Sequence, residues 1–304
     1  MTRTRTLALL IAAAIQAAAQ DASVPRDGFS LYYRVSGTGT PIVMLSGGPG
    51  VDVDYLAPVA ERLPPSFSRV LLEQRGTGRS RLSTLTPANM NLQLVVEDVE
   101  ALRVHLKQER LLLFGHSWGG MLAMSYAAAY PRRVDKLLLV GPGGMNWEYQ
   151  KYFGDNIRMR LRPEDLEAER YWLEAPRRGV DPDKALLERQ RAIVPGYFFD
   201  RAKGLAHASQ FVEGSFHGAA FFTLAGDLSK NYDVREALKT FGRPVLIVQG
   251  YQDPVGEVTA DETHALIKSS RLHYLHKCGH FPWVEQPEEF YRIVAAFLAE
   301  RSER

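Results

Sequence analysis

The stretch LLLFGHSWGG, residues 111–120, joins an apolar run to an alanine-rich segment through the pattern Gly-x-Ser-x-Gly. A short, continuously apolar run is typical of a buried strand, and residues 121–129 have the composition of a helix. A strand that passes into a helix through this pattern forms a very tight turn with the serine at its tip. Gly115 and Gly119 let the neighbouring backbone pass without a Cβ clash. Ser117 is therefore our candidate nucleophile, with its Oγ exposed.

Two backbone N–H groups near Ser117 are candidates for binding an oxyanion. The N–H of Trp118 lies in the first turn of the predicted helix, where it has no partner within the helix. Residues 46–50, Ser-Gly-Gly-Pro-Gly, continue neither a strand nor a helix, so their N–H groups point outward. We predict Gly48 as the second donor. The alternatives are an ordinary strand-to-helix turn that contains a serine and a plain glycine-rich turn.

Short apolar runs recur in both halves of the chain and predict the strands of one sheet. These runs are residues 29–35, 41–45, 69–73, 111–114, 136–140, 243–250 and 271–275. Helical periodicity over residues 91–107 and 285–301 completes repeated strand-helix units. Such units predict an α/β fold, with a mainly parallel sheet and helices on both faces. Gly76 and Gly78 belong to no complete GxGxxG pattern, which disfavours a dinucleotide-binding loop.

The strand-helix rhythm stops after the run at 136–140 and resumes only near residue 243. The intervening segment has polar helical stretches, interrupting prolines and many aromatic side chains, so we expect an inserted, mostly helical lid. Most of these rings should form the interior of the lid, and a minority should line a substrate pocket. The predicted organisation is a leader at 1–20, a first core part at 21–143, the lid at 144–241 and a second core part at 242–304.

Residues 1–20 differ from the rest of the chain. Arg3 and Arg5 precede an apolar run that ends in small residues near Ala19. This order is typical of a secretory signal peptide, so we expect an exported protein, periplasmic or secreted. After cleavage we expect no stable membrane association. The alternative is an uncleaved anchor, although the apolar run is shorter than the ~20 residues that span a bilayer.

The composition of the 304-residue chain is that of a globular protein, with 45% hydrophobic and 24% charged residues. Removing residues 1–20 takes away two arginines and no acid, which leaves a net charge near zero. A nucleic-acid partner, which requires a clustered basic surface, is therefore not expected. The single cysteine, Cys278, excludes an intrachain disulfide and a cysteine-based metal site. We predict no cofactor and no metal, and the sequence gives no indication of an oligomeric state.

Three residues with the chemistry of acyl transfer follow predicted strands. Ser117, Asp253 and His280 occur in the chain order Ser, Asp, His that the α/β-hydrolase fold uses. Because the active site of a parallel sheet lies at the carboxyl ends of its strands, we expect them to meet there. His280 would accept the Ser117 proton, and the Asp253 carboxylate would hold the imidazole in the required tautomer.

Several neighbouring residues compete for these roles. The competing acids are Asp227, Asp233 and Asp261, and the competing histidines are His273 and His276. We favour Asp253 and His280 because both follow strands in loop-like sequence. His116 precedes the elbow tip and is expected to face away from it, in a packing role. Cys278 is interpreted as a small buried or loop residue, because a serine already occupies the nucleophile position.

Three motifs resemble those of the proline iminopeptidase (prolyl aminopeptidase) family of α/β hydrolases. Residues 47–50 are similar to its HGGPG loop, residues 73–80 to DQRGxGxS, and residues 115–120 to GxSWGG. Two positions depart from these motifs, because Ser46 replaces the loop histidine and Glu73 replaces an aspartate. The resemblance implies a serine peptidase fold with a lid and a peptide substrate.

The resemblance also implies how a substrate amine would be bound. Family members hold the free α-amine through lid glutamates, and residues 212–214 are similar to the WEG segment that carries one of them. Glu213 is thus the candidate amine anchor, with a solvated surface acid as its alternative. No second lid glutamate matches, and one carboxylate offsets the desolvation of an ammonium poorly.

Three functions remain open at this point. The leading hypothesis is an exported aminopeptidase that releases N-terminal proline or a similar residue from small peptides. The second is a carboxylic-ester hydrolase or lactonase with the same three residues and an ester substrate, and the third is a non-catalytic ligand-binding protein on the same scaffold.

Overall fold

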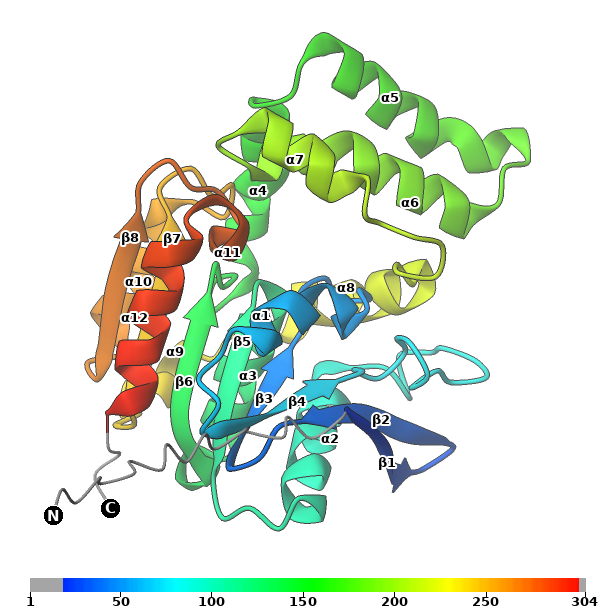
Figure 1. The fold of residues 1–304 in the computed structure, drawn as a ribbon. Helices are drawn as coiled ribbons and strands as arrows, with labels where there is room; N and C mark the ends of the chain where they lie inside the picture. Colours follow the sequence, from blue (N-terminus) through cyan, green and yellow to red (C-terminus); the bar gives the residue numbers. More distant parts are fainter. Residues whose placement is uncertain (1–18, 301–304) are drawn as a thin grey trace, which may run out of the picture.

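An eight-stranded sheet forms the centre of the molecule, with the strand order β1-β2-β4-β3-β5-β6-β7-β8 (Figure 1). The structure is a computed structural model, and it describes residues 19–300. The strands are β1 (Gln20–Arg26), β2 (Phe29–Ser36), β3 (Thr40–Leu45), β4 (Phe67–Leu72), β5 (Leu111–His116), β6 (Val134–Val140), β7 (Val245–Gly250) and β8 (Ser270–Leu275). The pairs β1–β2 and β2–β4 are antiparallel and the other pairs are parallel, which confirms the predicted mainly parallel sheet.

The central strands are apolar throughout because helices cover both of their faces. In β5, Leu111 and Leu113 pack into one hydrophobic layer, and Leu112 and Phe114 pack into the other. Each fully buried leucine contributes roughly 1.5–3 kcal/mol to folding. Residues from α2 (Leu92–His105), α3 (Trp118–Ala129) and α10 (Glu257–Leu266) line the first layer, and residues from α1 (Ala57–Glu61), α11 (Pro282–Glu285) and α12 (Pro287–Ala299) line the second.

The C-terminal helix is shorter than the predicted 285–301 and is preceded by a separate turn of helix. Pro287 begins α12, and Gln286 before it has φ −131° and ψ 57°, outside the helical region. Proline disfavours helical backbone in the residue before it, which explains the break. The buried face of α12 is as predicted, with Phe290, Ile293, Val294, Phe297 and Leu298 in the core.

The edge strand β1 is absent from the strands predicted from the sequence. It pairs antiparallel with β2, from Gln20 opposite Val35 to Arg26 opposite Phe29. Its seven residues include Pro25 and are largely polar, a composition that edge strands tolerate. The predicted leader lies outside the described residues except for 19 and 20. Within residues 19–300, no helix is long and apolar enough to cross a membrane.

The segment 144–241 divides into two parts. The helices α4 (Gln150–Arg158), α5 (Pro163–Glu174), α6 (Pro182–Ile193) and α7 (Arg201–Ala208) form a lobe beyond one end of the sheet (Figure 1). By contrast, α8 (Gly218–Asn231) and α9 (Arg235–Leu238) contribute Leu224, Leu228 and Leu238 to the main core. The boundaries of the predicted lid stay a prediction, and the observed lobe comprises α4 to α7.

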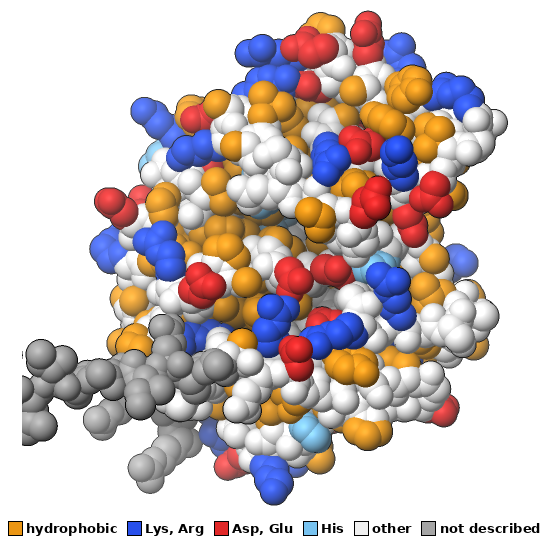
Figure 2. Space-filling view, turned by 45° about the vertical axis from the view of Figure 1, so that its right-hand side comes forward, with side chains coloured by type: hydrophobic (Ala, Val, Ile, Leu, Met, Phe, Trp, Pro, Cys, Tyr) orange, Lys and Arg blue, Asp and Glu red, His pale blue; other side chains and the backbone are white. Residues whose placement is uncertain are grey.

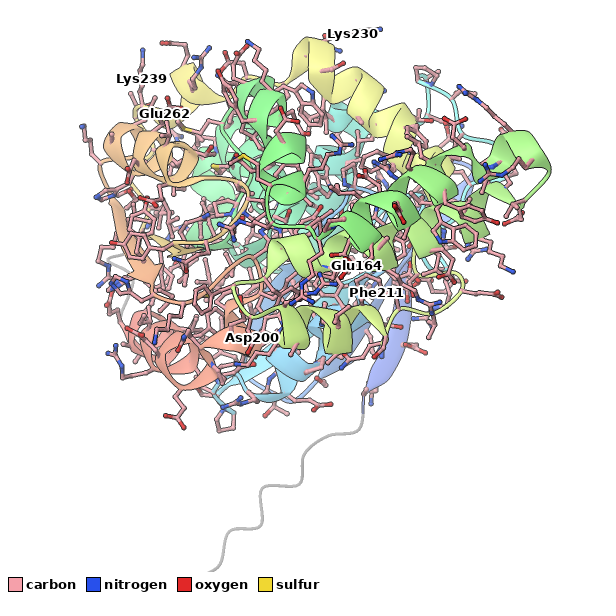
Figure 3. The ribbon with its side chains drawn as sticks, turned by 90° about the horizontal axis from the view of Figure 1, so that it is seen from above. Glu164, Asp200, Phe211, Lys230, Lys239 and Glu262 are labelled. Carbon is pink, nitrogen blue, oxygen red and sulfur yellow. The ribbon has the colours of Figure 1, made fainter. Side chains whose placement is uncertain are left out.

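Buried acids of α5 hold the lobe together. The Glu169 carboxylate accepts hydrogen bonds from Arg158 of α4 at 3.0 Å and from Arg189 of α6 at 2.9 Å. Asp165 binds Arg201 of α7 in the same way, with one contact at 2.8 Å. Looking down on the lobe, Figure 3 shows Asp200, the residue before α7, close to the C-terminal helices. The ion pairs of Glu169 and Asp165 therefore join α5 to α4, α6 and α7.

Candidate active site

The turn after β5 places Ser117 in a strained backbone conformation. Ser117 has φ 56° and ψ −118° and caps the N-terminus of α3. A positive φ is uncommon for a residue with a side chain and marks a site where the surroundings hold the backbone. A Cβ added to Gly115 would lie 2.3 Å from the Gly119 oxygen, and one added to Gly119 would lie 2.1 Å from the Leu45 oxygen. The structure thus requires glycine at both positions.

Asp253 and His280 meet at the carboxyl end of the sheet. His280 Nδ1 lies 2.8 Å from Asp253 Oδ2, and both residues are at most 4% exposed. A carboxylate only accepts, so Nδ1 carries the proton of this bond. The other Asp253 oxygen accepts from the N–H of Val255 at 2.9 Å, which fixes the carboxylate. His280 Nε2 is thereby left as the free nitrogen of the ring.

Ser117 directly follows His116, whose ring contacts that of His280. The ring of His116 is centred 4.6 Å from the ring of His280. Within the described part of the chain, no hydrogen bond joins Ser117 Oγ to His280 Nε2, and neither atom is among the fully buried ones that lack a partner. Both atoms therefore keep some accessible surface. Catalytic hydrogen bonds are often long before a substrate binds.

The two predicted oxyanion donors have free N–H groups. Neither Gly48 nor Trp118 donates its backbone N–H to another group among residues 19–300. The loop lies against the serine, because a Cβ on Gly47 would come within 3.2 Å of Ser117 Cβ. Gln74 ties the two donor segments together. Its Nε2 donates to the Ser46 carbonyl at 2.9 Å and its Oε1 accepts from the Trp118 indole at 2.8 Å.

Glu213 lies in a turn beside the glycine-rich loop, with its side chain exposed. Three residues later, Phe216 forms a β-bridge with Val51, and the N–H of His217 donates to the Gly50 carbonyl at 2.8 Å. Among the described residues the Glu213 carboxylate has no hydrogen-bond or ion-pair partner. The structure therefore brings the segment of Glu213 to the rim of the loop, where Asp52 also lies, its N–H donating to the Ser215 carbonyl at 3.1 Å.

The competing acids have structural partners elsewhere. Asp227 accepts from the N–H of Leu92 at 2.8 Å, Asp233 pairs with Arg235, and Asp261 accepts from the Tyr274 hydroxyl at 2.8 Å. Each of these three carboxylates is therefore bound to a residue other than His280.

The competing histidines and the cysteine are also accounted for. The His276 ring packs against Tyr251, with centroids 4.5 Å apart, and His273 lies within β8. Cys278 is buried, and burial raises the pKa of its thiol well above the usual range. A thiol with a raised pKa is a poor nucleophile at neutral pH.

Glu285 is a site residue that the sequence analysis missed. Its buried carboxylate accepts three backbone N–H bonds, from Gly279 at 2.6 Å, Asp200 at 2.8 Å and Phe199 at 3.2 Å. Burial raises the pKa of this carboxyl, although the three N–H bonds oppose the rise. Glu285 thus joins the loop of His280 to the lobe. In the sequence it is one of several acids near the start of an amphipathic helix, which gives no signal of this role.

A polar hollow lies at the β1 and β2 edge, apart from Ser117 and His280. Its volume is about 510 Å³, and its lining comprises Ala19, Asp21, Arg34, Asp52, Val53, Asp54, Glu73, Gly78 and Arg79. Most of its charges pair internally, as Arg79 does with Glu73. On the face drawn in Figure 2, acidic and basic side chains are interspersed. No group of His, Cys, Asp and Glu in residues 19–300 is arranged to hold a metal ion.

Comparison with known proteins identifies the fold family of the chain. Residues 40–287 match the family model described as the alpha/beta hydrolase fold. The chain is 26% identical over 295 residues to the proline iminopeptidase of Lactobacillus helveticus, covering 93% of this chain and 99% of that protein. These matches confirm the predicted fold and the resemblance to proline iminopeptidases.

Solved structures share the fold at lower identity. The proline iminopeptidase of Mycobacterium smegmatis superposes with a TM-score of 0.70 at 23% identity, covering 92% of this chain and 97% of that one. An esterase from Exiguobacterium antarcticum gives a TM-score of 0.68 at 19% identity, with 91% and 99% coverage. The same scaffold thus occurs in proteins named for two kinds of substrate.

Proposed function

The chain belongs to the alpha/beta hydrolase fold family, and from this premise we propose that it is a serine hydrolase whose nucleophile is Ser117. The observation that carries the proposal is the buried pair of Asp253 and His280, 2.8 Å apart, whose imidazole contacts the ring of His116, the residue before the strained elbow serine. In this proposal the non-catalytic binding protein is set aside, because such an arrangement stores strain that a binding surface does not need.

The proposed reaction proceeds through an acyl-enzyme. Ser117 Oγ attacks the substrate carbonyl carbon while His280 Nε2 takes its proton, and Asp253 stabilises the imidazolium that forms. The N–H groups of Gly48 and Trp118 hold the oxyanion of the tetrahedral intermediate. His280 then gives its proton to the leaving group, and a water that it activates releases the acyl group. No metal or cofactor enters this scheme.

As the substrate we propose a small peptide with a free N-terminal proline or a similar residue. This assignment is supported by the similarity to proline iminopeptidases along almost the whole chain. It is also supported by Glu213, whose unpaired carboxylate lies in the segment that bridges to Val51 beside the glycine-rich loop. There it would bind the α-ammonium of a substrate whose carbonyl reaches Ser117.

A panel of proline anilides with free and with acylated amines tests this assignment. We expect the wild-type enzyme to cleave the free-amine substrate, and a fluorophosphonate to leave Ser117→Ala unlabelled. In Glu213→Gln we expect a KM about 10-fold higher, since a charge-assisted hydrogen bond is worth ~1.5–3 kcal/mol. Glu167→Gln, which changes an exposed acid of the lobe, is the matched control and should leave KM unchanged. Equal cleavage of the acylated anilide would exclude an amine-reading exopeptidase.

The second candidate is a carboxylic-ester hydrolase or lactonase that uses the same residues. It is favoured because no second lid glutamate in the sequence matches the motif of the proline iminopeptidases, and an ammonium held by one exposed acid is weakly bound. Activity on p-nitrophenyl esters and lactones with none on any anilide would establish this candidate over the first.

We also propose that the protein is exported, on the strength of the basic, apolar and small-residue parts of residues 1–20. N-terminal sequencing of protein from the periplasm or the medium tests this, with a new N-terminus near residue 20 expected. Intracellular protein that keeps its first twenty residues would contradict export.

A further inference from the structure

A single tyrosine hydroxyl links the glycine-rich loop to the nucleophile elbow. Tyr55 lies in the 3₁₀ turn Val53–Leu56, just after the loop. Its Oη lies 2.6 Å from the backbone nitrogen of Gly47 and 2.7 Å from Nδ1 of His116. Gly47 precedes the proposed donor Gly48, and His116 precedes Ser117. One oxygen atom therefore contacts the direct neighbours of two proposed catalytic groups.

The other nitrogen of the same imidazole reaches the third catalytic segment. His116 Nε2 lies 3.0 Å from the backbone carbonyl oxygen of His280. A continuous chain thus runs from Gly47 through Tyr55 and His116 to His280. His116 is 2% exposed, and its ring contacts Phe281 and Trp283 at centroid distances of 5.2 and 4.8 Å. The chain crosses a part of the site that is largely closed to water, where hydrogen bonds are strong.

The partners determine where each proton lies. The Gly47 N–H can only donate, so Tyr55 Oη accepts there and gives its own proton to His116 Nδ1. The His280 carbonyl can only accept, so His116 Nε2 must carry the proton. Burial holds the pKa of His116 well below its ordinary value, which keeps the ring neutral, as this pattern requires. In the hydrogen-bond chain from Gly47 to His280, every contact therefore has one donor and one acceptor.

We propose that Tyr55 and His116 are positioning residues that hold the glycine-rich loop, the elbow and the His280 loop in register for catalysis. The inference rests on the serine-hydrolase function proposed above. Because the Gly47 N–H is bound inward by Tyr55, the next N–H, that of Gly48, stays free to face the substrate oxygen. Neither side chain contacts the proposed nucleophile oxygen through a hydrogen bond in the described residues, so both act through their neighbours.

Tyr55→Phe tests the proposal because it removes the hydroxyl and keeps the ring, which stacks on Trp283. On an ester substrate we expect kcat to fall about 10- to 100-fold with KM unchanged, somewhat less than the ~10²–10³ lost with a whole oxyanion donor. Binding of a boronic acid, which forms a tetrahedral adduct on the serine, should weaken by the same factor. A smaller folded fraction also lowers the apparent kcat with KM unchanged, so the affinity for the boronic acid, which does not depend on the amount of active enzyme, is the decisive readout.

Tyr126→Phe is the matched control. It removes the hydroxyl of Tyr126, a buried tyrosine of α3 away from the site, which donates to Glu100 of α2 at 2.7 Å. We expect a similar loss of thermal stability in both variants and a loss of kcat only in Tyr55→Phe. A Tyr55→Phe enzyme with wild-type kcat, or with a loss no larger than that of the control, overturns the proposal.

A spectroscopic measurement keeps the proposal testable without any substrate. In ¹⁵N-labelled protein the His116 ring should show an unprotonated Nδ1 and a protonated Nε2, and Tyr55→Phe should shift the Nδ1 resonance. A His116 ring protonated at Nδ1 and not at Nε2 would refute the proposed hydrogen-bond chain. Fluorophosphonate labelling of the wild type separates the two proposals, because an unlabelled Ser117 contradicts the hydrolase function, whereas the tautomer reports on the chain alone.

Discussion

At the level of single residues, Gly141 approaches the Asp253 and His280 pair too closely to carry a side chain. Gly141 follows β6 with φ 49°, and a Cβ there would lie 2.8 Å from Asp253 Oδ2 and 3.0 Å from His280 Nδ1. Contacts below 3.0 Å to a fixed, buried pair force one member to move. The absence of a side chain at Gly141 thus provides the space in which the carboxylate and the imidazole form their hydrogen bond.

Gly141→Ala should therefore disable catalysis more than it destabilises the fold. We expect kcat to fall at least about 100-fold, since a displacement of ~1 Å at a catalytic group can cost that much. Gly28→Ala is the control, because Gly28 also has a positive φ, 76°, and has no atom within 4 Å of its added Cβ. Kinetics and thermal unfolding of both variants check this. Equal activity in the two would show that the pair tolerates the methyl group.

Some site residues were predictable at this scale and others were not. Asp253 and His280 each follow an apolar strand in a loop, a pattern that sequence reveals, and the structure places them 2.8 Å apart. Their catalytic roles remain proposals. Tyr55 and Glu285 act by hydrogen-bonding to backbone N–H groups of loops, and such contacts leave no pattern in residue types. His116 was expected to pack away from the site, whereas its ring lies against His280.

At the level of elements, the lobe depends on carboxylates of α5. Burial raises the pKa of Glu169, but hydrogen bonds from Arg158 and Arg189 outweigh it and leave the pKa below its ordinary value of 4.5. An acid with a lowered pKa in the folded state stabilises that state above its unfolded pKa. The stabilisation is lost as the pH falls from about 4.5 through the folded pKa.

Acid should therefore loosen the lobe before the core. We expect the protection of the α5 amides, expressed relative to the intrinsic exchange rate at each pH, to fall as the pH drops below about 4.5. Glu169→Gln should lower this protection already at pH 7, by about 1–3 kcal/mol of local stability. Hydrogen exchange followed by mass spectrometry measures both effects. Glu167→Gln, an exposed change on the same helix, should behave as wild type. Unchanged exchange in Glu169→Gln would mean that apolar packing alone holds the lobe.

The sequence predicted elements best where burial on both faces makes a strand apolar. β5 and β7 are such strands, and both lie where their apolar runs predicted them. β1 escaped prediction because an edge strand is half exposed and tolerates polar residues and Pro25. The division of 144–241 also escaped, since α8 is amphipathic whether it covers a lobe or a sheet. Composition does not distinguish between these two partners.

At the level of the whole molecule, the single cysteine reports on unfolding. Cys278 is fully buried between β8 and the His280 loop, and burial raises the pKa of its thiol. We expect a disulfide reagent such as DTNB to label about one thiol per chain in denaturant and almost none in the native protein, because the thiolate reacts only when accessible. Labelling at the global unfolding rate is the expected result. Rapid labelling of native protein would reveal local opening of the His280 loop.

The triple contact of Glu285 has a consequence for how a substrate enters. One carboxylate holds the N–H groups of Phe199 and Asp200 in the lobe and that of Gly279 next to His280. Swinging this corner of the lobe outward would break the bonds from Phe199 and Asp200, and also the bond of 2.8 Å from the His280 N–H to the Tyr197 carbonyl, which holds the proposed general base in place. Opening this corner to admit a ligand would therefore disrupt the arrangement that the proposed reaction needs. We expect substrate to enter and product to leave on the opposite side, through small movements of the turn that contains Glu213. The contacts of Glu285 should stay intact during turnover.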